Sequence, residues 1–169
     1  MAGRLLIFCG IPGSGKTTIA RLVAAASPKS IHIQTDAVRG MIAQPTFAAE
    51  ESEFVYAACI SVAREALDRD YLVILDGTFG SKKRRSSTLA TLEGHYSRVD
   101  FVLVVCDLET ALRRNRERAA TVPADRLKGI FDAFDPIPGA LVVDTSAVPP
   151  KISAERIVKG LLYPLVPPE

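Results

Sequence analysis

The chain has 169 residues and a net charge of +2, with 48% hydrophobic and 24% charged residues. This length and balance are typical of one globular domain with a sizeable core. The small net charge excludes a strongly basic nucleic-acid-binding protein, so only local basic clusters remain candidates for binding anions.

The three cysteines, Cys9, Cys59 and Cys106, are widely spaced and lie in apolar stretches. They predict reduced, buried thiols and not a disulfide framework or a zinc site. The sequence has no signal-peptide pattern and no apolar run of membrane-spanning length. We therefore expect a cytoplasmic protein with no membrane association, and the oligomeric state stays open.

The first apolar run spans residues 5–9, and a glycine-rich turn follows it. Residues 10–17 satisfy the phosphate-loop pattern G-x-x-x-x-G-K-[ST] between a predicted strand and a predicted helix. Glycines let successive backbone N–H groups point at a phosphate, and the helix N-terminus adds partial positive charge. The motif therefore predicts a site for ATP and Mg²⁺, although preference for ATP over other nucleoside triphosphates stays open. The predicted nucleotide-binding residues are Gly10, Ile11, Pro12, Gly13, Ser14, Gly15, Lys16, Thr17 and Thr18.

Within this motif, two side chains carry most of the chemistry. Lys16 can reach the β- and γ-phosphates of a bound nucleotide. The hydroxyl of Thr17 can ligate Mg²⁺. We therefore expect Lys16 to act as a catalytic residue and Thr17 as a metal ligand.

Strands and helices alternate along the rest of the chain. Further strands are predicted at residues 30–34, 71–76, 98–105 and 140–144. Helices are predicted at about residues 15–26, 36–42, 48–70, 81–96, 108–120, 124–134 and 153–162. The alternation predicts a single α/β domain over residues 1–169, with a five-stranded parallel sheet and helices on both faces. We expect this P-loop NTPase fold to carry a helical lid at about residues 108–123.

Two carboxylates follow predicted strands at the edge where ligands of such sheets bind. Asp36 and Arg39 form D-x-x-R after the second strand, so a helical turn would place them on one face. There Asp36 could accept the proton of an attacking hydroxyl and Arg39 could fork onto a phosphate. The alternative is a helix-capping aspartate beside a solvated arginine.

Asp76 ends the third predicted strand and precedes Gly77-Thr78. This is the position of the second acidic residue of phosphate-loop enzymes, so we expect Asp76 to help hold Mg²⁺. Two alternatives stay open, namely that Asp76 orients Arg39 or that it is a turn aspartate before glycine.

Basic residues gather in two predicted helices. One helix contains Arg113, Arg114, Arg116 and Arg118, of which Arg114 and Arg118 are four apart and share a face. At least one of these is expected to be a lid arginine beside the transferred phosphate, the alternative being a solvated face. The other cluster, residues 82–85, could contact an acidic substrate or only aid solubility.

Four aromatic residues near the predicted site could stack on a base. They are Phe47, Phe54, Tyr56 and Phe79. Apolar residues repeat at three- and four-residue spacing along the helix at residues 48–70, and Phe54 belongs to that repeat. Core packing is therefore the expected use of Phe54.

Taken together, these motifs resemble the P-loop kinases related to phage polynucleotide kinase, among the AAA-type ATP-binding kinase domains. The resemblance rests on the phosphate loop, on D-x-x-R, on the strand-ending Asp76, and on R-N-x-x-R followed by Val122-Pro123. It implies Asp36 as the general base, Arg39 as a contact to an acceptor phosphate, and Arg114 and Arg118 as lid arginines. Residues 140–146 are also similar to adenylylsulfate kinases.

The sequence thus predicts an ATP-dependent kinase acting on a hydroxyl group. The favoured acceptor is a nucleotide, a nucleoside or a polynucleotide 5′-hydroxyl. A small metabolite or antibiotic is the next candidate. A nucleotide switch with slow hydrolysis, and a nucleic-acid-binding module without chemistry, are candidates from other classes.

Overall fold

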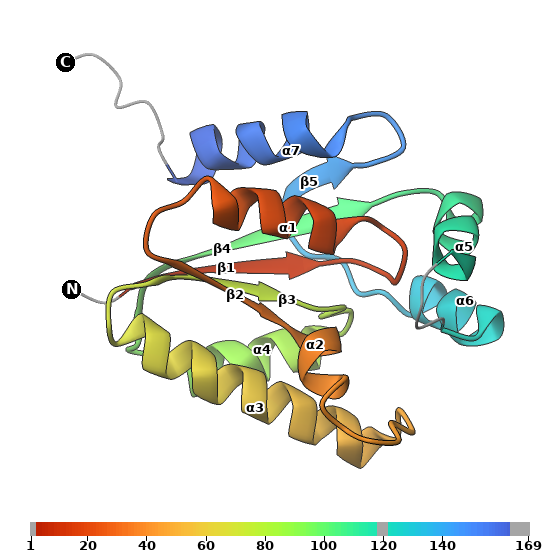
Figure 1. The fold of residues 1–169 in the computed structure, drawn as a ribbon, viewed down its shortest axis with the longest axis horizontal. Helices are drawn as coiled ribbons and strands as arrows, with labels where there is room; N and C mark the ends of the chain where they lie inside the picture. The colour runs from red at the N-terminus through yellow and green to blue at the C-terminus, as the bar shows by residue number, and fades with distance from the viewer. Residues whose placement is uncertain (1–2, 118–121, 163–169) are drawn as a thin grey trace.

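A computed structural model of the chain describes residues 3–117 and 122–162. Five parallel strands form one sheet in the order β2-β3-β1-β4-β5 (Figure 1). The strands are β1 (Gly3–Cys9), β2 (Ser30–Gln34), β3 (Leu72–Asp76), β4 (Tyr96–Val105) and β5 (Leu141–Asp144). The helices are α1 (Lys16–Ala25), α2 (Thr35–Arg39), α3 (Ala49–Leu67), α4 (Lys82–Thr91), α5 (Leu108–Arg116), α6 (Ala124–Asp132) and α7 (Pro150–Ile157). The predicted α/β class and five-stranded parallel sheet are confirmed.

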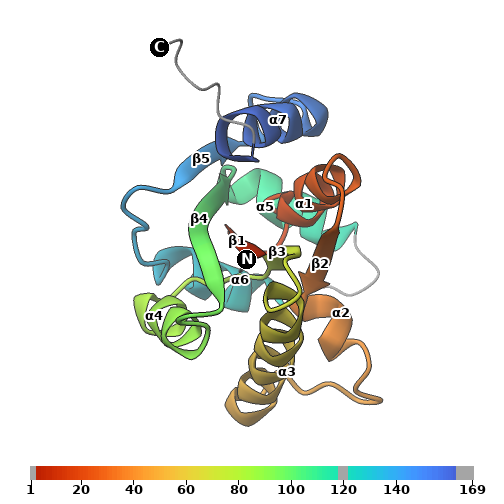
Figure 2. The same cartoon turned by 90° about the vertical axis from the view of Figure 1, so that its left-hand side faces the viewer.

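Helices cover both faces of the sheet (Figure 2). Alternate residues of β1 point to opposite faces of the sheet. Leu6 and Phe8 pack in the apolar cluster with α1 and α7. Leu5 and Ile7 pack on the opposite face in the cluster with α3. A strand buried on both faces is apolar throughout, which is the pattern seen in β1.

Helices α5 and α6 lie beyond the carboxyl ends of the central strands (Figure 1). A small apolar cluster of Ile11, Cys106, Ala111 and Leu127 joins them to the start of the phosphate loop. The predicted lid segment therefore begins with a packed helix next to the nucleotide-binding turn.

All three cysteines are free and buried, as the sequence predicted. Burial raises the pKa of Cys9 to about 12 and that of Cys59 to about 11. Both thiols are therefore protonated at neutral pH. None of the described helices combines the length and apolar character needed to cross a membrane.

Several element boundaries differ from those predicted. Helix α4 ends at Thr91, five residues early, because Gly94 takes a left-handed conformation (φ +82°) and Tyr96 begins β4. The last helix begins at Pro150, where proline suits the first helical turn. Ser153, the first residue of the predicted helix, lies inside the observed one, and its hydroxyl donates to the carbonyl of Pro149 at 3.2 Å.

The aromatic residues have separate environments. Phe54 is 61% exposed, so the predicted core role is wrong. The apolar stripe of α3 is wider than the surface it covers, and the structure buries the adjacent row that contains Val55 and Cys59. Phe79 is buried and packs edge-to-face on Tyr56, with ring centroids 5.1 Å apart. The Phe47 ring contacts the Arg39 guanidinium.

The basic cluster at residues 82–85 divides into two parts. Arg85 is 5% exposed, and its guanidinium donates to the backbone carbonyls of Phe79, Gly80, Asp135 and Pro136 at 2.8, 2.9, 3.3 and 2.8 Å. Arg84 pairs with Glu53 and lies over the Tyr56 ring. Arg84 and Arg85 therefore make contacts within the protein. Lys82 and Lys83 are exposed, and contact with an acidic substrate stays a prediction for them.

We expect Arg85→Met to lower the free energy of unfolding by about 2–4 kcal/mol, because four carbonyls lose a buried donor. Urea denaturation measures this change. The exposed neighbour supplies a control, since Lys83→Met should change the free energy of unfolding by less than about 0.5 kcal/mol. Equal changes in the two variants would contradict a structural role for Arg85.

Candidate functional site

The phosphate loop adopts a turn that requires glycine at two positions. Gly13 has φ +82° and Gly15 has φ +91°, both in the left-handed region. A Cβ atom on Gly13 would also lie 2.4 Å from the carbonyl oxygen of Ala111 in α5. The turn therefore has both an unusual backbone shape and a neighbour that leaves no room for a side chain.

Hydrogen bonds fix this turn to the ends of two other strands. Gly10 N donates to the carbonyl of Thr78, just past β3, at 3.2 Å. The hydroxyl of Thr145, just past β5, donates to the carbonyl of Ser14 at 2.8 Å. The N–H of Ile19 bonds to the Gly15 carbonyl at 3.3 Å and so begins the hydrogen-bond ladder of α1.

One cavity of about 320 Å³ opens in front of the turn. It is lined by Gly13, Gly15, Lys16, Thr17, Thr18, Gln34, Asp36 and Arg114. Three of the predicted groups, Lys16, Asp36 and Arg114, therefore meet although they lie far apart in the sequence. Gln34 was not predicted, and the only signal for it was its place as the last residue of a strand.

Lys16 is 7% exposed and its ammonium group contacts the carbonyl of Ile11 at 3.5 Å. The positive charge is therefore held against the loop, at the floor of the cavity.

Asp76 lies behind the cavity and is 2% exposed. Its Oδ2 accepts a hydrogen bond from His32 Nε2 at 3.2 Å. Burial alone raises the pKa of Asp76, but the His32 hydrogen bond, the Lys16 charge and the Thr17 hydroxyl outweigh it, so the pKa lies below its usual value. The carboxylate is therefore ionised at neutral pH.

The other oxygen of this carboxylate, Asp76 Oδ1, is buried and has no hydrogen-bond partner among the residues that the structure describes. A buried oxygen without a partner is costly, and the Thr17 hydroxyl lies close enough to lower the pKa of the carboxyl. Carboxylate and hydroxyl oxygens are donors that Mg²⁺ accepts, usually together with phosphates and waters. Thr17 and Asp76 thus fit a magnesium site.

Arg39 lies outside the cavity lining and is held by α3. It pairs with Glu51 and donates to the Ser52 hydroxyl at 3.2 Å. Glu51, and not Asp76, therefore orients the guanidinium in this structure. Arg39 and Asp36 remain one helical turn apart on α2.

Phe47 connects this region to α6. Two guanidinium groups contact its ring, with Arg39 Cζ 4.8 Å and Arg126 Cζ 5.3 Å from its centroid. Arg126 also donates to the Phe47 carbonyl at 3.0 Å. Phe47 has φ +58°, and its N–H donates to Glu51 at 3.1 Å, which holds the strained turn. We call Phe47, Arg39 and Arg126 the Phe47 clasp.

Arg114 links α5 to the phosphate loop through one threonine. Its guanidinium donates to the hydroxyl and the carbonyl of Thr145 at 2.9 and 3.2 Å. Thr145 in turn donates to the Ser14 carbonyl, so these hydrogen bonds hold the Arg114 guanidinium at the edge of the cavity. Thr145 was not predicted as a site residue.

The neighbouring residue explains part of the R-N-x-x-R motif. Asn115 is 3% exposed, and its amide bonds to the carbonyl and the N–H of Val122 at 2.7 and 3.1 Å. It therefore closes the start of α6 onto α5. Arg118, the second expected lid arginine, lies outside the described residues, and Arg113 and Arg116 are exposed.

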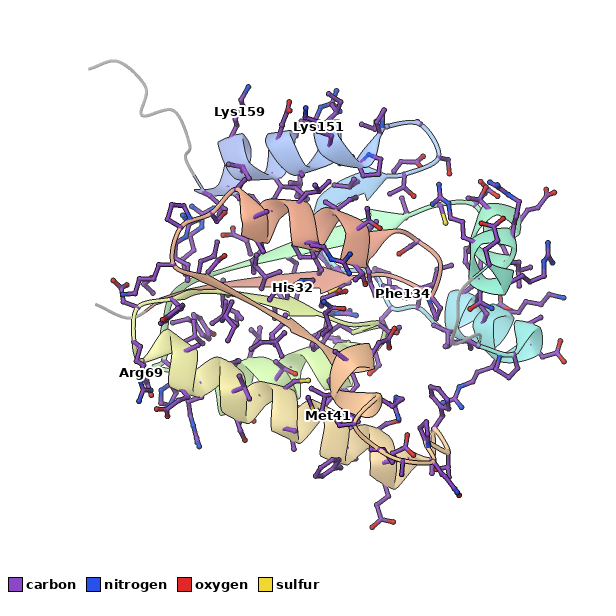
Figure 3. All side chains as sticks on the ribbon, viewed as in Figure 1. His32, Met41, Arg69, Phe134, Lys151 and Lys159 are labelled. Atoms are coloured by element: carbon purple, nitrogen blue, oxygen red, sulfur yellow. The ribbon has the colours of Figure 1, made fainter. Side chains whose placement is uncertain are left out.

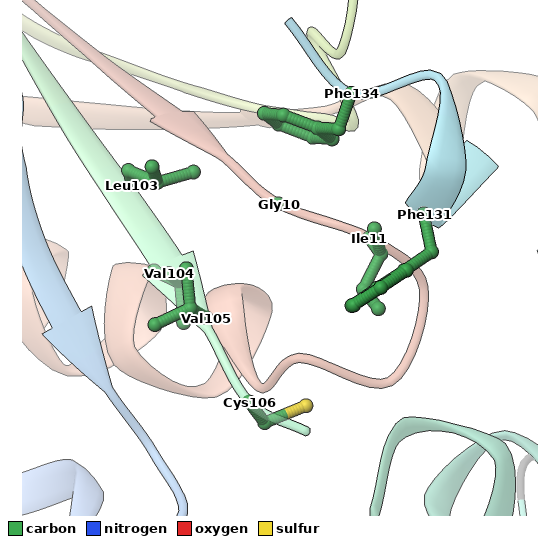
Figure 4. Close-up of a pocket in the computed structure, with 8 residues that line it drawn as sticks. All are labelled: Gly10, Ile11, Leu103, Val104, Val105, Cys106, Phe131 and Phe134. Carbon is green, nitrogen blue, oxygen red and sulfur yellow. The ribbon is translucent and has the colours of Figure 1, made fainter. Parts of the chain in front are cut away.

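Two further cavities adjoin the loop. One of about 400 Å³ is lined by Gly15, Thr18, Arg114 and residues 145–150, and so shares three residues with the first. The other, of about 310 Å³, is apolar and lies between the end of β4 and α6 (Figure 4). It is lined by Gly10, Ile11, Leu103, Val104, Val105, Cys106, Phe131 and Phe134. Burial raises the pKa of Cys106, so this thiol is no nucleophile at neutral pH.

A model of the AAA domain family matches residues 5–137, most of the chain. The chain belongs to this family. The matched region contains the phosphate loop, Asp36, Asp76 and Arg114, and the predicted resemblance to AAA-type ATP-binding domains is confirmed.

Relatives of this AAA domain protein include an L-seryl-tRNA(Sec) kinase of Methanococcus maripaludis, which is 28% identical. The match covers 94% of the chain but 64% of that relative, so the chain spans less than two thirds of its length. An APS kinase of Mycobacterium tuberculosis, solved with AMPPNP and APS, superimposes with a TM-score of 0.73 at 17% identity, covering 93% of this chain and 96% of that one. A chain of the Pnkp1/Rnl/Hen1 RNA repair complex has a TM-score of 0.69 at 22% identity, covering 87% and 51%. These two structures share the fold.

We expect Thr145→Val to weaken ATP binding about 5- to 30-fold, because the loop and Arg114 lose a shared anchor worth about 1–2 kcal/mol. Isothermal titration calorimetry measures the affinity. Thr145→Ser keeps the hydroxyl and should bind ATP within about 3-fold of the original protein. Weakening of equal size in both variants would contradict a specific role for the hydroxyl, because Thr145→Ser keeps it.

Proposed function

We propose that this protein is an ATP-dependent kinase that transfers the γ-phosphate of ATP to a hydroxyl group. One observation carries the proposal. The cavity of about 320 Å³ is lined both by the phosphate loop and by Asp36, so a γ-phosphate and a proton acceptor would face the same space.

In the proposed reaction, Asp36 accepts the proton of the acceptor hydroxyl as its oxygen attacks the γ-phosphorus. The new O–P bond forms while the bond to the bridging oxygen of ADP breaks, and ADP leaves. Lys16 and Arg114 stabilise the charge that develops on the phosphoryl oxygens. Arg118 is proposed as a second lid arginine on the basis of the family resemblance.

Mg²⁺, held by Thr17 and Asp76, would neutralise charge on the β- and γ-phosphates. The nucleoside part of ATP would enter the adjoining cavity of about 400 Å³, because Gly15, Thr18 and Arg114 line both spaces. We place the enzyme in the cytoplasm.

The favoured acceptor is a nucleotide, a nucleoside or a polynucleotide 5′-hydroxyl. The names of two relatives, an L-seryl-tRNA(Sec) kinase and a member of an RNA repair complex, support this class. Arg39 is proposed to contact an acceptor phosphate one helical turn from Asp36.

A small metabolite is the second candidate acceptor. The superposition on an APS kinase over 93% of this chain favours it. A nucleotide switch with slow hydrolysis is a weaker candidate, because such a protein has no need of the Asp36 carboxylate beside the γ-phosphate.

We expect Asp36→Asn to lower kcat about 10²- to 10⁴-fold, because the amide cannot accept the hydroxyl proton. ATP affinity, measured by calorimetry, should stay unchanged, since the phosphates are held by the loop. Asp132→Asn is the matched control, because Asp132 is exposed at the end of α6 and should leave kcat unchanged. An unaltered kcat in Asp36→Asn would remove Asp36 as the base.

The acceptor can be identified with γ-labelled ATP. The panel comprises 5′-hydroxyl oligonucleotides, nucleosides, adenylylsulfate, aminoglycosides and chloramphenicol. We expect label to move to a member of the nucleoside or oligonucleotide group, and an oligonucleotide acceptor should bind less tightly as salt rises. Label on adenylylsulfate or an antibiotic would support the second candidate. Label in free phosphate alone would contradict the kinase and support the switch.

A further inference from the structure

A histidine lies next to the buried carboxylate behind the phosphate loop. Strands β2 and β3 pair in parallel, with Gln34 opposite Asp76 and His32 opposite Ile74. His32 lies inside the molecule, whereas Lys151 and Lys159 lie on the outer side of α7 (Figure 3). Its side chain is 11% exposed, and its Nε2 is 3.2 Å from Asp76 Oδ2.

A second hydrogen bond sets which nitrogen of His32 carries the proton. The side-chain amide of Gln34 lies 3.4 Å from His32 Nδ1. When the amide nitrogen donates to Nδ1, the neutral ring has its proton on Nε2 and donates it to Asp76. The three side chains therefore form a directed chain, from Gln34 at the nucleotide cavity through His32 to Asp76.

The two oxygens of Asp76 consequently have different surroundings. Oδ2 is held by His32, whereas Oδ1 is buried and no atom of residues 3–117 or 122–162 forms a hydrogen bond with it. Oδ1 therefore keeps its capacity to accept a hydrogen bond or to ligate a cation, and the Thr17 hydroxyl is close enough to lower the pKa of the carboxyl.

We infer that His32 is a positioning residue for the metal–nucleotide complex, because it fixes Oδ2 and so leaves Oδ1 directed toward Mg²⁺ or its bound water. The inference rests on the proposed function, in which Mg²⁺–ATP is the bound form. Hydrogen bonds from a neighbouring group commonly orient a metal-binding carboxylate, and losing one typically costs 10- to 100-fold in metal affinity.

Substitution of His32 by glutamine or by asparagine tests which of the two ring nitrogens matters. In His32→Gln the terminal –NH₂ can occupy the place of Nε2 and donate to Asp76. In His32→Asn the side chain is one bond shorter and its amide matches the place of Nδ1. A role in positioning Asp76 therefore requires the glutamine variant to keep function and the asparagine variant to lose it.

The test measures ATP affinity by calorimetry, with Mg²⁺ and again with EDTA. We expect His32→Asn and His32→Leu to lower affinity for Mg²⁺–ATP about 10- to 100-fold. Affinity for metal-free ATP should stay unchanged, and His32→Gln should recover most of the Mg²⁺-dependent affinity. Urea denaturation checks that each variant is folded, and the glutamine–asparagine comparison holds even if the leucine variant does not fold.

The chain supplies its own control in a second histidine–aspartate pair. His95 Nδ1 lies 2.7 Å from Asp68 Oδ1 at the surface, away from the loop. His95→Asn should change neither affinity.

Three results would overturn the inference. One is an equal loss with and without Mg²⁺, which is the result of a purely structural role. Another is no loss in His32→Asn. The third is a loss in His32→Gln as large as that in His32→Asn. If one of these results occurs while the unmodified protein still labels an acceptor, the kinase proposal is kept and only the role of His32 is rejected. If the unmodified protein binds ATP equally with and without Mg²⁺ and labels no acceptor, both fall.

Discussion

The left-handed turn at Gly13 and Gly15 is the constraint on which the rest of the site depends. Two residues there have backbone angles that favour glycine, and the carbonyl of Ala111 leaves no space for a Cβ on the first. Glycines also give a loop more conformational freedom, so the turn needs contacts from outside to hold its shape. Thr78 after β3 and Thr145 after β5 bond to it directly. The ends of β1, β3 and β5 are thereby joined beside the cavity of about 320 Å³.

Much of this arrangement could be predicted from the sequence because it follows from two regular features. Continuous apolar runs mark strands that are covered on both faces, and their alternation with helices fixes a parallel sheet whose carboxyl ends share an edge. Once Lys16, Asp36 and Asp76 are assigned to strand ends, topology places them together. The structure brings Lys16 and Asp36 to one cavity and Asp76 directly behind it.

The remaining features depend on contacts that leave no local pattern. Arg85 is one of four consecutive basic residues, and only the approach of residues 135–136 makes it a buried donor. His32 and Thr145 are single polar residues whose partners are 44 and 131 residues away. Phe54 fits the helical repeat, yet it lies at the margin of a stripe wider than the sheet surface beneath it. In each case the neighbour, and not the residue itself, decides the outcome.

The Phe47 clasp has a practical consequence. The Phe47 ring contacts one arginine of α2 and one of α6, so moving these two helices apart would break at least one of the two contacts. The chain contains no tryptophan. A Phe47→Trp protein would therefore carry a single indole at this junction, and its emission would report on any change in the spacing of α2 and α6.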